Sequence, residues 1–185
     1  MLHPEGSPYT EEECDELLDM YHRAFPGIRL WQQRIRREVR ATKKLTNRWG
    51  HTWDVRYEEM NEDLYRRAYN YLAQSECAYL TNNCFAKLHS WLRNAHMGSK
   101  ILMQVHDSLV CSCPPHEAYD VACFIRDHLE VELDYDGTSL SVPTEWAVGI
   151  NWGDKHEIGA LPERATFEKH LRDILGHVGQ DENSS

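Results

Sequence analysis

The sequence of 185 residues predicts an α+β fold, in which N-terminal helices precede a small antiparallel sheet. Three observations support this class. Apolar residues recur at helical spacing through most of residues 10–95. Two short apolar runs, "ILMQVH" and "LVCSC", then flank a tight turn and indicate a β-hairpin. Beyond the hairpin, a third strand stands between two amphipathic helical patterns, one covering the sheet and one C-terminal.

Three helices are expected in the first half of the chain. Thr10, followed by acidic residues, predicts the N-cap of a helix that runs to about Phe25, where Pro26-Gly27 ends it. The second helix, "IRLWQQRIRREVRATKK", carries apolar residues at helical spacing and basic residues elsewhere. The third helix is expected over about 60–95. Between these two, "TNRWGHTW" predicts a turn with short extended arms.

The second half begins with the predicted hairpin, which reverses direction at Asp107-Ser108. Pro114-Pro115 stops its second strand, because proline cannot donate to a strand ladder. An amphipathic helix is then expected from His116 to about Leu133, and this helix covers the sheet.

The last elements are a strand and a terminal helix. Apolar residues alternate in "LSVPTEWAVGI", which predicts a third strand with Trp146, Val148 and Ile150 on one face. An amphipathic helix follows over 163–178. The chain thus divides into a helical segment, a sheet subdomain, an extra C-terminal helix and a disordered polar tail, over 1–98, 99–156, 157–178 and 179–185.

The totals restrict the class of protein. Hydrophobic residues make up 41% of the chain, which is enough for a packed core. No apolar run reaches the roughly 18 residues of a membrane span, and the N-terminus lacks a basic and apolar signal region. We therefore expect a cytoplasmic protein with no membrane partner. Six cysteines without a CxxC pair indicate reduced thiols rather than a disulfide or zinc framework.

Charge is distributed unevenly along the chain. The net charge of −10 argues against a free-standing nucleic-acid binder. Residues 1–22 hold acidic side chains and no lysine or arginine, whereas residues 23–48 are strongly basic and hold the single acid Glu38. The basic stretch suits contact with phosphates, and it equally suits a solvated helix face.

Asp107 and His106 stand where the two apolar strands meet. A carboxylate at the tip of a hairpin is held rigidly by the strands and stays open to a metal and to a substrate phosphate. Mg²⁺ prefers one or two carboxylates together with water and phosphate oxygens. An adjacent histidine can donate to a phosphate, although His-Asp dipeptides also occur in ordinary turns.

Arg66, Asn70 and Gln74 follow one another at i, i+4 and i+8 in the third predicted helix. This spacing places them in one polar stripe. A cation and two amides in file can contact phosphates, sugars or base edges along a duplex. An exposed helix face without a ligand would show the same pattern.

Several motifs occur together in a specific order: "Y(x3)FPGI(x2)W", a basic helix, "TNRWG", "R(x3)N(x3)Q", "QVHD" and "VPTEWAVGINWGDKH". This succession resembles the C-terminal part of family A DNA polymerases, the group of bacterial polymerase I and phage replicases. The likeness covers about residues 17–156. Its strongest pieces are "LMQVHDSLV", which looks like the motif C of the family, and the closing "NWGDKH".

The resemblance implies roles for the candidate residues. Asp107 would be the motif C aspartate, a ligand of two catalytic Mg²⁺ ions in the palm subdomain, and His106 would lie near the terminal phosphate of the primer. The duplex-contacting helix and the "TNRWG" turn would touch primer-template DNA through Arg66, Asn70, Gln74, Asn47 and Arg48. The enzyme would use dNTPs in the cytoplasm of a bacterial or phage-infected cell.

The sequence departs from the family pattern in two ways. Ser108 stands where the family usually has glutamate after the aspartate, and His51 follows Gly50 where the family commonly has arginine. Moreover, the sequence contains no "DYSxxE"-like motif A and no fingers helix. One aspartate cannot hold two metal ions about 3.5–4 Å apart, so the chain alone is not expected to polymerise DNA.

We therefore expect a split polymerase, in which a second polypeptide carries motif A, the fingers and the thumb. Three alternatives stay open: an inactive remnant of a polymerase gene, a non-catalytic DNA-binding or regulatory subunit, and an unrelated His-Asp metal hydrolase. The net charge counts against the binding subunit. The lack of HxxxH or HxH spacing counts against the hydrolase.

Overall fold

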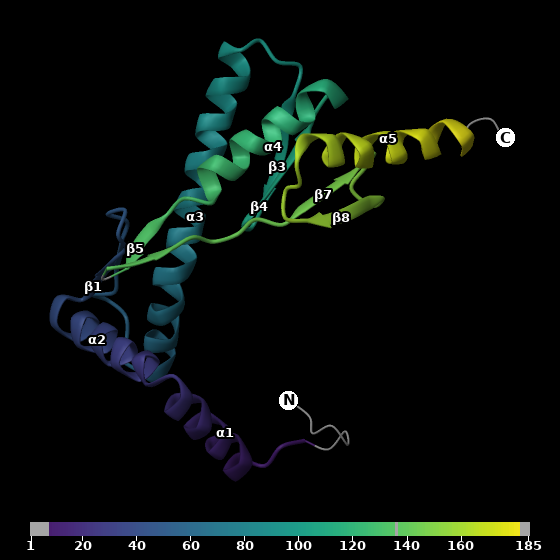
Figure 1. The fold of residues 1–185 in the computed structure, drawn as a ribbon. Helices are drawn as coiled ribbons and strands as arrows, with labels where there is room; N and C mark the ends of the chain where they lie inside the picture. The colour runs from purple at the N-terminus through teal and green to yellow at the C-terminus, as the bar shows by residue number, and fades with distance from the viewer. Residues whose placement is uncertain (1–7, 136, 182–185) are drawn as a thin grey trace. The chain divides into compact units, whose positions relative to one another are not determined.

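The computed structural model describes residues 8–135 and 137–181. The chain forms two compact units, an N-terminal unit up to Glu76 and a C-terminal unit from Cys77 onward. Helix α3 (Glu62–Asn94) continues from the first unit into the second. Figure 1 shows the elements along the chain, with helices predominating before the strands. The α+β class and the order of its elements are confirmed.

The N-terminal unit consists of helices and one small hairpin, followed by the first half of α3. Its elements are α1 (Glu11–Ala24), α2 (Pro26–Thr42), β1 (Lys44–Thr46) and β2 (Thr52–Asp54). The predicted N-cap at Thr10 is confirmed: Thr10 Oγ1 accepts from the Glu13 amide at 3.3 Å, while Glu13 Oε2 accepts from the Thr10 amide at 2.8 Å. Proline at the first position of α2 starts that helix.

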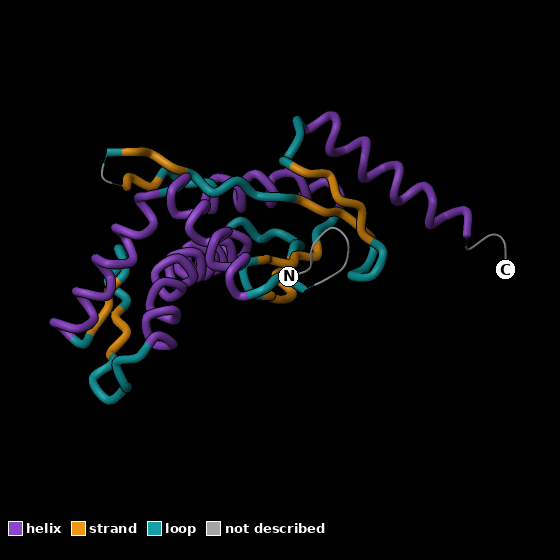
Figure 2. Tube along the Cα trace, turned by 90° about the horizontal axis from the view of Figure 1, so that it is seen from below, coloured by secondary structure: helices purple, strands orange, loops and turns teal. Residues whose placement is uncertain are grey.

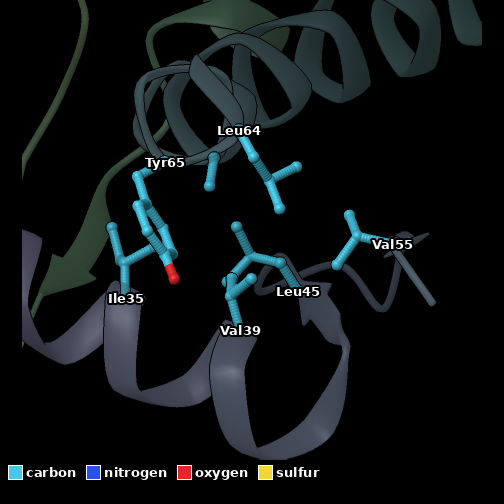
Figure 3. Packing of buried hydrophobic residues seen from close by; sticks show 7 residues of the cluster. Ile35, Val39, Leu45, Val55, Leu64 and Tyr65 are labelled. Carbon is cyan, nitrogen blue, oxygen red and sulfur yellow. The ribbon is translucent and has the colours of Figure 1, made fainter. Parts of the chain in front are cut away.

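The core of the N-terminal unit lies between α2, the β1–β2 hairpin and α3 (Figure 3). Apolar side chains from all three elements are at most 1% exposed: Ile35, Val39, Leu45, Val55, Leu64, Tyr65 and Ala68. The predicted helical spacing of Ile35 and Val39 therefore corresponds to the buried face of α2.

Part of the basic stretch serves this packing. The Arg36 guanidinium forms an ion pair with Glu62 and donates to the hydroxyl of Tyr69. These partners raise the pKa of Arg36 further above its usual value, chiefly through the Glu62 hydrogen bond. Arg40 Nε donates to the Tyr65 hydroxyl at 2.7 Å. These arginines thus fasten α2 to α3 instead of facing a phosphate.

The C-terminal unit combines the second half of α3 with three antiparallel strand pairs and two more helices. Its elements are β3 (Lys100–Val105), β4 (Ser108–Ser112), α4 (Pro115–Leu129), β5 (Leu133–Tyr135), β6 (Thr138–Leu140), β7 (Trp146–Gly149), β8 (Lys155–Gly159) and α5 (Arg164–Asp181). The core packs α3 against α4 through Cys84, Leu88, Leu92, Val121 and Ile125.

Among the described residues, each strand pairs only with its neighbour in the chain, in antiparallel two-stranded sheets (Figure 2). The third predicted strand, β7, therefore pairs with β8 and not with the β3–β4 hairpin. Trp146 and Val148 lie half-buried as expected, whereas Ile150 falls outside the strand and is 46% exposed. The outer edges of β3 and β4 have no strand beside them within the described part of the chain.

The C-terminal segment differs in detail from its expected boundaries. β8 occupies residues 155–159, so the terminal helix begins only at Arg164. This helix includes residues 179–181 of the expected tail, and 182–185 lie outside the described residues. Phe167 is 2% exposed and packs edge-on against Tyr119 of α4, with ring centroids 5.4 Å apart. Arg164 also forms an ion pair with Asp120, so α5 is fastened to α4.

Candidate nucleic-acid interface and metal-binding turn

His106 and Asp107 form the two-residue turn of the β3–β4 hairpin, closed by the pair Val105–Ser108. The turn lies one residue earlier than the sequence predicts. His106 has a φ of 54°, and the positive φ at the first turn position is typical of a type II′ turn, where glycine is usual. Both side chains are exposed, so the turn presents an imidazole and a carboxylate to the surroundings.

The base of this hairpin is fixed by burial and by a carboxylate. Cys111 packs against the core of the C-terminal unit, and burial raises the pKa of its thiol to about 12. Glu117 of α4 accepts hydrogen bonds from the amides of Gly98 and Ser99 at 2.9 and 2.8 Å, and from the Ser99 hydroxyl. The Ser99 bond is the main cause that lowers the pKa of Glu117. These contacts anchor the base of the hairpin that carries the turn.

Asp107 can supply one oxygen ligand to a divalent metal. Among the described residues it accepts from the Ser108 hydroxyl, 3.5 Å from Oδ1, and no ion pair is formed with it there. Within the described part of the chain, no three histidine, cysteine, aspartate or glutamate side chains cluster as a metal site. The turn therefore fits Mg²⁺ as one contributor, because this ion takes few carboxylates and completes its shell with water and phosphate oxygens.

Arg66, Asn70 and Gln74 lie along one exposed face of α3 in the N-terminal unit. We call these three residues the α3 row. The opposite face of the same turns carries Leu64 and Ala68, which are fully buried. Because the helix is anchored from behind, the α3 row is presented on a rigid support. Its contact with DNA stays a prediction.

Asn47 shapes the tip of the β1–β2 hairpin, which we define as residues 47–51. Its side chain is 4% exposed. Oδ1 accepts from the amides of Trp49 and His51, both at 3.0 Å, and Nδ2 donates to Ser75 Oγ at 3.0 Å. Both ends of the amide are thus used inside the protein, which makes Asn47 a positioning residue for the tip. Its predicted contact with DNA is not tested by this geometry.

The tip lies against α3 beside the α3 row. Ser75, the partner of Asn47, directly follows Gln74, and the Tyr71 hydroxyl donates to the His51 carbonyl oxygen at 3.0 Å. The exposed Arg48 belongs to this tip. The structure therefore brings two of the predicted DNA-contacting groups together within the N-terminal unit.

Two residues of this arrangement are not among the candidates from the sequence. Tyr71 has the spacing of a core residue, and Ser75 gives no pattern at all. Their role depends on which residues of the hairpin meet α3. Helical periodicity does not contain that information, because it describes one element at a time.

Comparison with known proteins defines the class. Residues 6–154 match the family model of DNA polymerase family A, which is well over half of the chain. The chain therefore belongs to DNA polymerase family A, and the resemblance seen in its motifs is confirmed. Helix α5 lies beyond the matched residues.

Individual relatives agree with this assignment. The chain is 26% identical over 186 residues to a DNA polymerase of Bacillus phage SP01, covering 95% of this chain and 19% of the relative. It is 30% identical over 148 residues to the thermostable DNA polymerase I of Thermus aquaticus, covering 77% of this chain and 17% of the relative. The chain thus spans less than a fifth of the length of these relatives.

A solved structure shares the fold. The POL domain of Pol1 from M. smegmatis, in complex with DNA primer-template and dNTP, matches with a TM-score of 0.59 at 21% identity. The match covers 65% of this chain and 22% of that one. Among the described residues, none of the helices is long and apolar enough to cross a membrane. The cytoplasmic location stays a prediction.

Proposed function

We propose that this chain supplies the motif C aspartate and primer-template contacts of a DNA-directed DNA polymerase that uses Mg²⁺ and dNTPs. The observation that supports this most is the position of Asp107: an exposed carboxylate on the two-residue turn of a hairpin, in a chain of DNA polymerase family A. The residues that complete the metal site, with the fingers and thumb, would lie outside residues 1–185, on a second polypeptide as the sequence predicts or in a longer form of this one.

Asp107 is the residue of this chain that would hold the metal. Bound Mg²⁺ would lower the pKa of the primer 3′-hydroxyl and neutralise charge on the triphosphate. Asp107 contributes negative charge and a fixed direction, because the pairing of β3 with β4 sets its place. His106, beside it, would donate to a phosphate of the primer.

The second acid must come from elsewhere, for a reason of charge and geometry. Two ions about 3.5–4 Å apart repel each other and need more than one bridging carboxylate. Ser108 offers a hydroxyl where a second acid would stand in the family pattern. A carboxylate donated by another segment would satisfy both ions, whether it belongs to a partner chain or to a longer form of this polypeptide.

In the N-terminal unit, the α3 row and Arg48 would hold the duplex. Arginine contacts phosphates and base edges, while asparagine and glutamine can bind base edges or sugars. All four side chains are exposed. The location of these groups on one compact unit also favours a second candidate function, a DNA-binding subunit without catalysis, because duplex binding there does not need Asp107.

Primer extension by a reconstituted enzyme tests the proposal. This chain is mixed with a polypeptide that carries motif A, fingers and thumb, together with primed template, dNTPs and Mg²⁺. We expect extension by the wild type, at least a hundredfold loss for Asp107→Asn, and unchanged duplex affinity. Asp173→Asn, an exposed aspartate on α5, is the matched control.

The outcomes separate the two candidate functions. Extension that survives Asp107→Asn removes this residue from the reaction. Duplex binding without extension under any complement supports the DNA-binding subunit instead. Extension by the native product of the gene alone would show that the completing acid belongs to the same polypeptide.

A further inference from the structure

Two side-chain hydrogen bonds join the β1–β2 tip to α3. The α3 residues that form them, Tyr71 and Ser75, are not among the DNA-contacting residues predicted from the sequence. Tyr71 donates its hydroxyl proton to the His51 carbonyl oxygen at 3.0 Å, and Asn47 Nδ2 donates to Ser75 Oγ at 3.0 Å. They meet the tip at its two ends, residues 47 and 51. We call this pair of bonds the tip latch.

We propose that Tyr71 and Ser75 are positioning residues for duplex binding: the tip latch holds residues 47–51 beside the α3 row, so that DNA meets one preformed surface. This inference rests on the proposed duplex contact by the α3 row. It adds residues whose role is to fix Arg48, and neither Tyr71 nor Ser75 needs to touch DNA.

Hydrogen bonds within the tip fix its own shape. The Asn47 amide donates to the His51 carbonyl oxygen at 2.9 Å, and the Gly50 amide donates to the Asn47 carbonyl oxygen at 3.0 Å. Gly50 has a φ of 85°, a conformation that glycine adopts without strain. With its internal shape fixed in this way, the tip can still pivot on its short strands unless α3 holds it.

The positions on α3 explain the choice of these two residues. Tyr71 follows Asn70 and Ser75 follows Gln74, so each latch residue is one step along the helix from a member of the α3 row. A displacement of the tip would therefore change the spacing between Arg48 and the row. Holding both in the bound arrangement removes an ordering cost from association.

The ring and the hydroxyl of Tyr71 have separable roles. The ring packs on Trp53 with centroids 5.5 Å apart, and this contact survives a change to phenylalanine. Only the bond to His51 is lost in Tyr71→Phe. Ser75→Ala is a harsher change, because it leaves the buried amide of Asn47 without one partner.

Fluorescence anisotropy of a labelled primer-template hairpin, titrated with the full chain at several salt concentrations, tests the proposal. We expect Tyr71→Phe to weaken binding by about threefold to tenfold, the range of one lost hydrogen bond. The slope of log affinity against log salt concentration should become shallower by about one, as for Arg48→Ala, because the phosphate contact of Arg48 is lost in both variants. Tyr69→Phe is the matched control: it removes another tyrosine hydroxyl from α3, one that accepts from Arg36 of α2, and it should leave the slope unchanged.

A double-mutant cycle with Tyr71→Phe and Arg48→Ala tests whether Tyr71 acts by positioning Arg48. If the latch acts through Arg48, adding Tyr71→Phe to Arg48→Ala causes no further loss of affinity. Hydrogen exchange at the His51 amide in the free chain should also speed up in Tyr71→Phe and not in Tyr69→Phe.

Two results would count against the inference and can be told apart. Additive losses, or a salt slope that Tyr71→Phe leaves unchanged, would overturn the latch while the duplex contact by the row stands. If Arg66→Ala and Gln74→Ala also leave affinity unchanged, the duplex surface itself is wrong, and the proposed function fails at that point.

Discussion

His106 holds a backbone conformation that glycine adopts more readily than any residue with a side chain. A φ of 54° costs an L-residue on the order of 1 kcal/mol. The exposed ring makes no core contact that would offset this cost. Strain of this kind is typical of functional positions, and it agrees with the proposed phosphate contact of the imidazole.

His106→Gly should separate stability from function. Glycine relieves the strain but loses more entropy on folding, so we expect the free energy of unfolding to stay within about 1 kcal/mol of the wild type or to rise. Primer extension in the reconstituted enzyme should fall at least tenfold, since the donor is lost. Urea unfolding and extension assays measure the two effects, and a fall in stability with full activity would contradict the functional role.

The cysteines should differ in reactivity according to burial. Cys111 has a pKa of about 12 against an ordinary value of 9.0, so at pH 8 its thiolate fraction is lower by about a thousandfold. Cys14 and Cys77 are exposed. Alkylation of the folded chain should label these two first and Cys111 only after denaturation, as followed by mass spectrometry. Early labelling of Cys111 would show that the β3–β4 hairpin opens readily.

At the scale of single elements, Lys43 ends α2 in the left-handed conformation, with a φ of 56°. Helices commonly place glycine at this position. Lys43→Gly should therefore stabilise the N-terminal unit by about 0.5–1 kcal/mol, seen as a higher urea midpoint with an unchanged slope. Lys44→Gly, in the neighbouring strand, serves as the control and should destabilise. A gain from both changes would point to charge instead of conformation.

Helix boundaries marked by a capping residue or a proline were predictable from the sequence. Thr10 marks a helix start by side-chain chemistry that acts within one turn, and this start is confirmed. The break between the first two helices at Pro26 is confirmed as well, although the second helix begins at Pro26 itself and not at Ile28 as expected. The partner of β7 was not predictable, because alternation in a strand says which face is buried but not which strand lies beside it. The one-residue error at the His106-Asp107 turn has the same origin.

The candidate site likewise contains features that the sequence predicts and features that it does not. The spacing of Arg66, Asn70 and Gln74 predicts a common exposed face, and α3 places them on one. Asn47 stands in the sequence as a polar residue of an exposed turn, yet it is buried and bonded at both ends of its amide. Such a role follows from tertiary contacts with α3, which no single-element pattern reveals.

At the scale of the whole molecule, the two units have separate cores. Phe167→Ala removes a 2%-exposed ring from the packing of α5 and should destabilise the C-terminal unit by about 3 kcal/mol. Ile35→Ala should act similarly on the N-terminal unit. Hydrogen exchange resolved along the chain measures both effects. Equal loss of protection in both units from either change would show that they unfold together.

Within the described part of the chain, the outer edges of the β3–β4 hairpin carry no further strand. Leu102, Met103 and Val105 on β3 are 58%, 46% and 37% exposed, and no further strand pairs with β3 among the described residues. Strands of this kind recruit identical copies and stack into fibrils. We therefore expect the isolated chain to aggregate as its concentration rises, and a partner that covers this edge to prevent it.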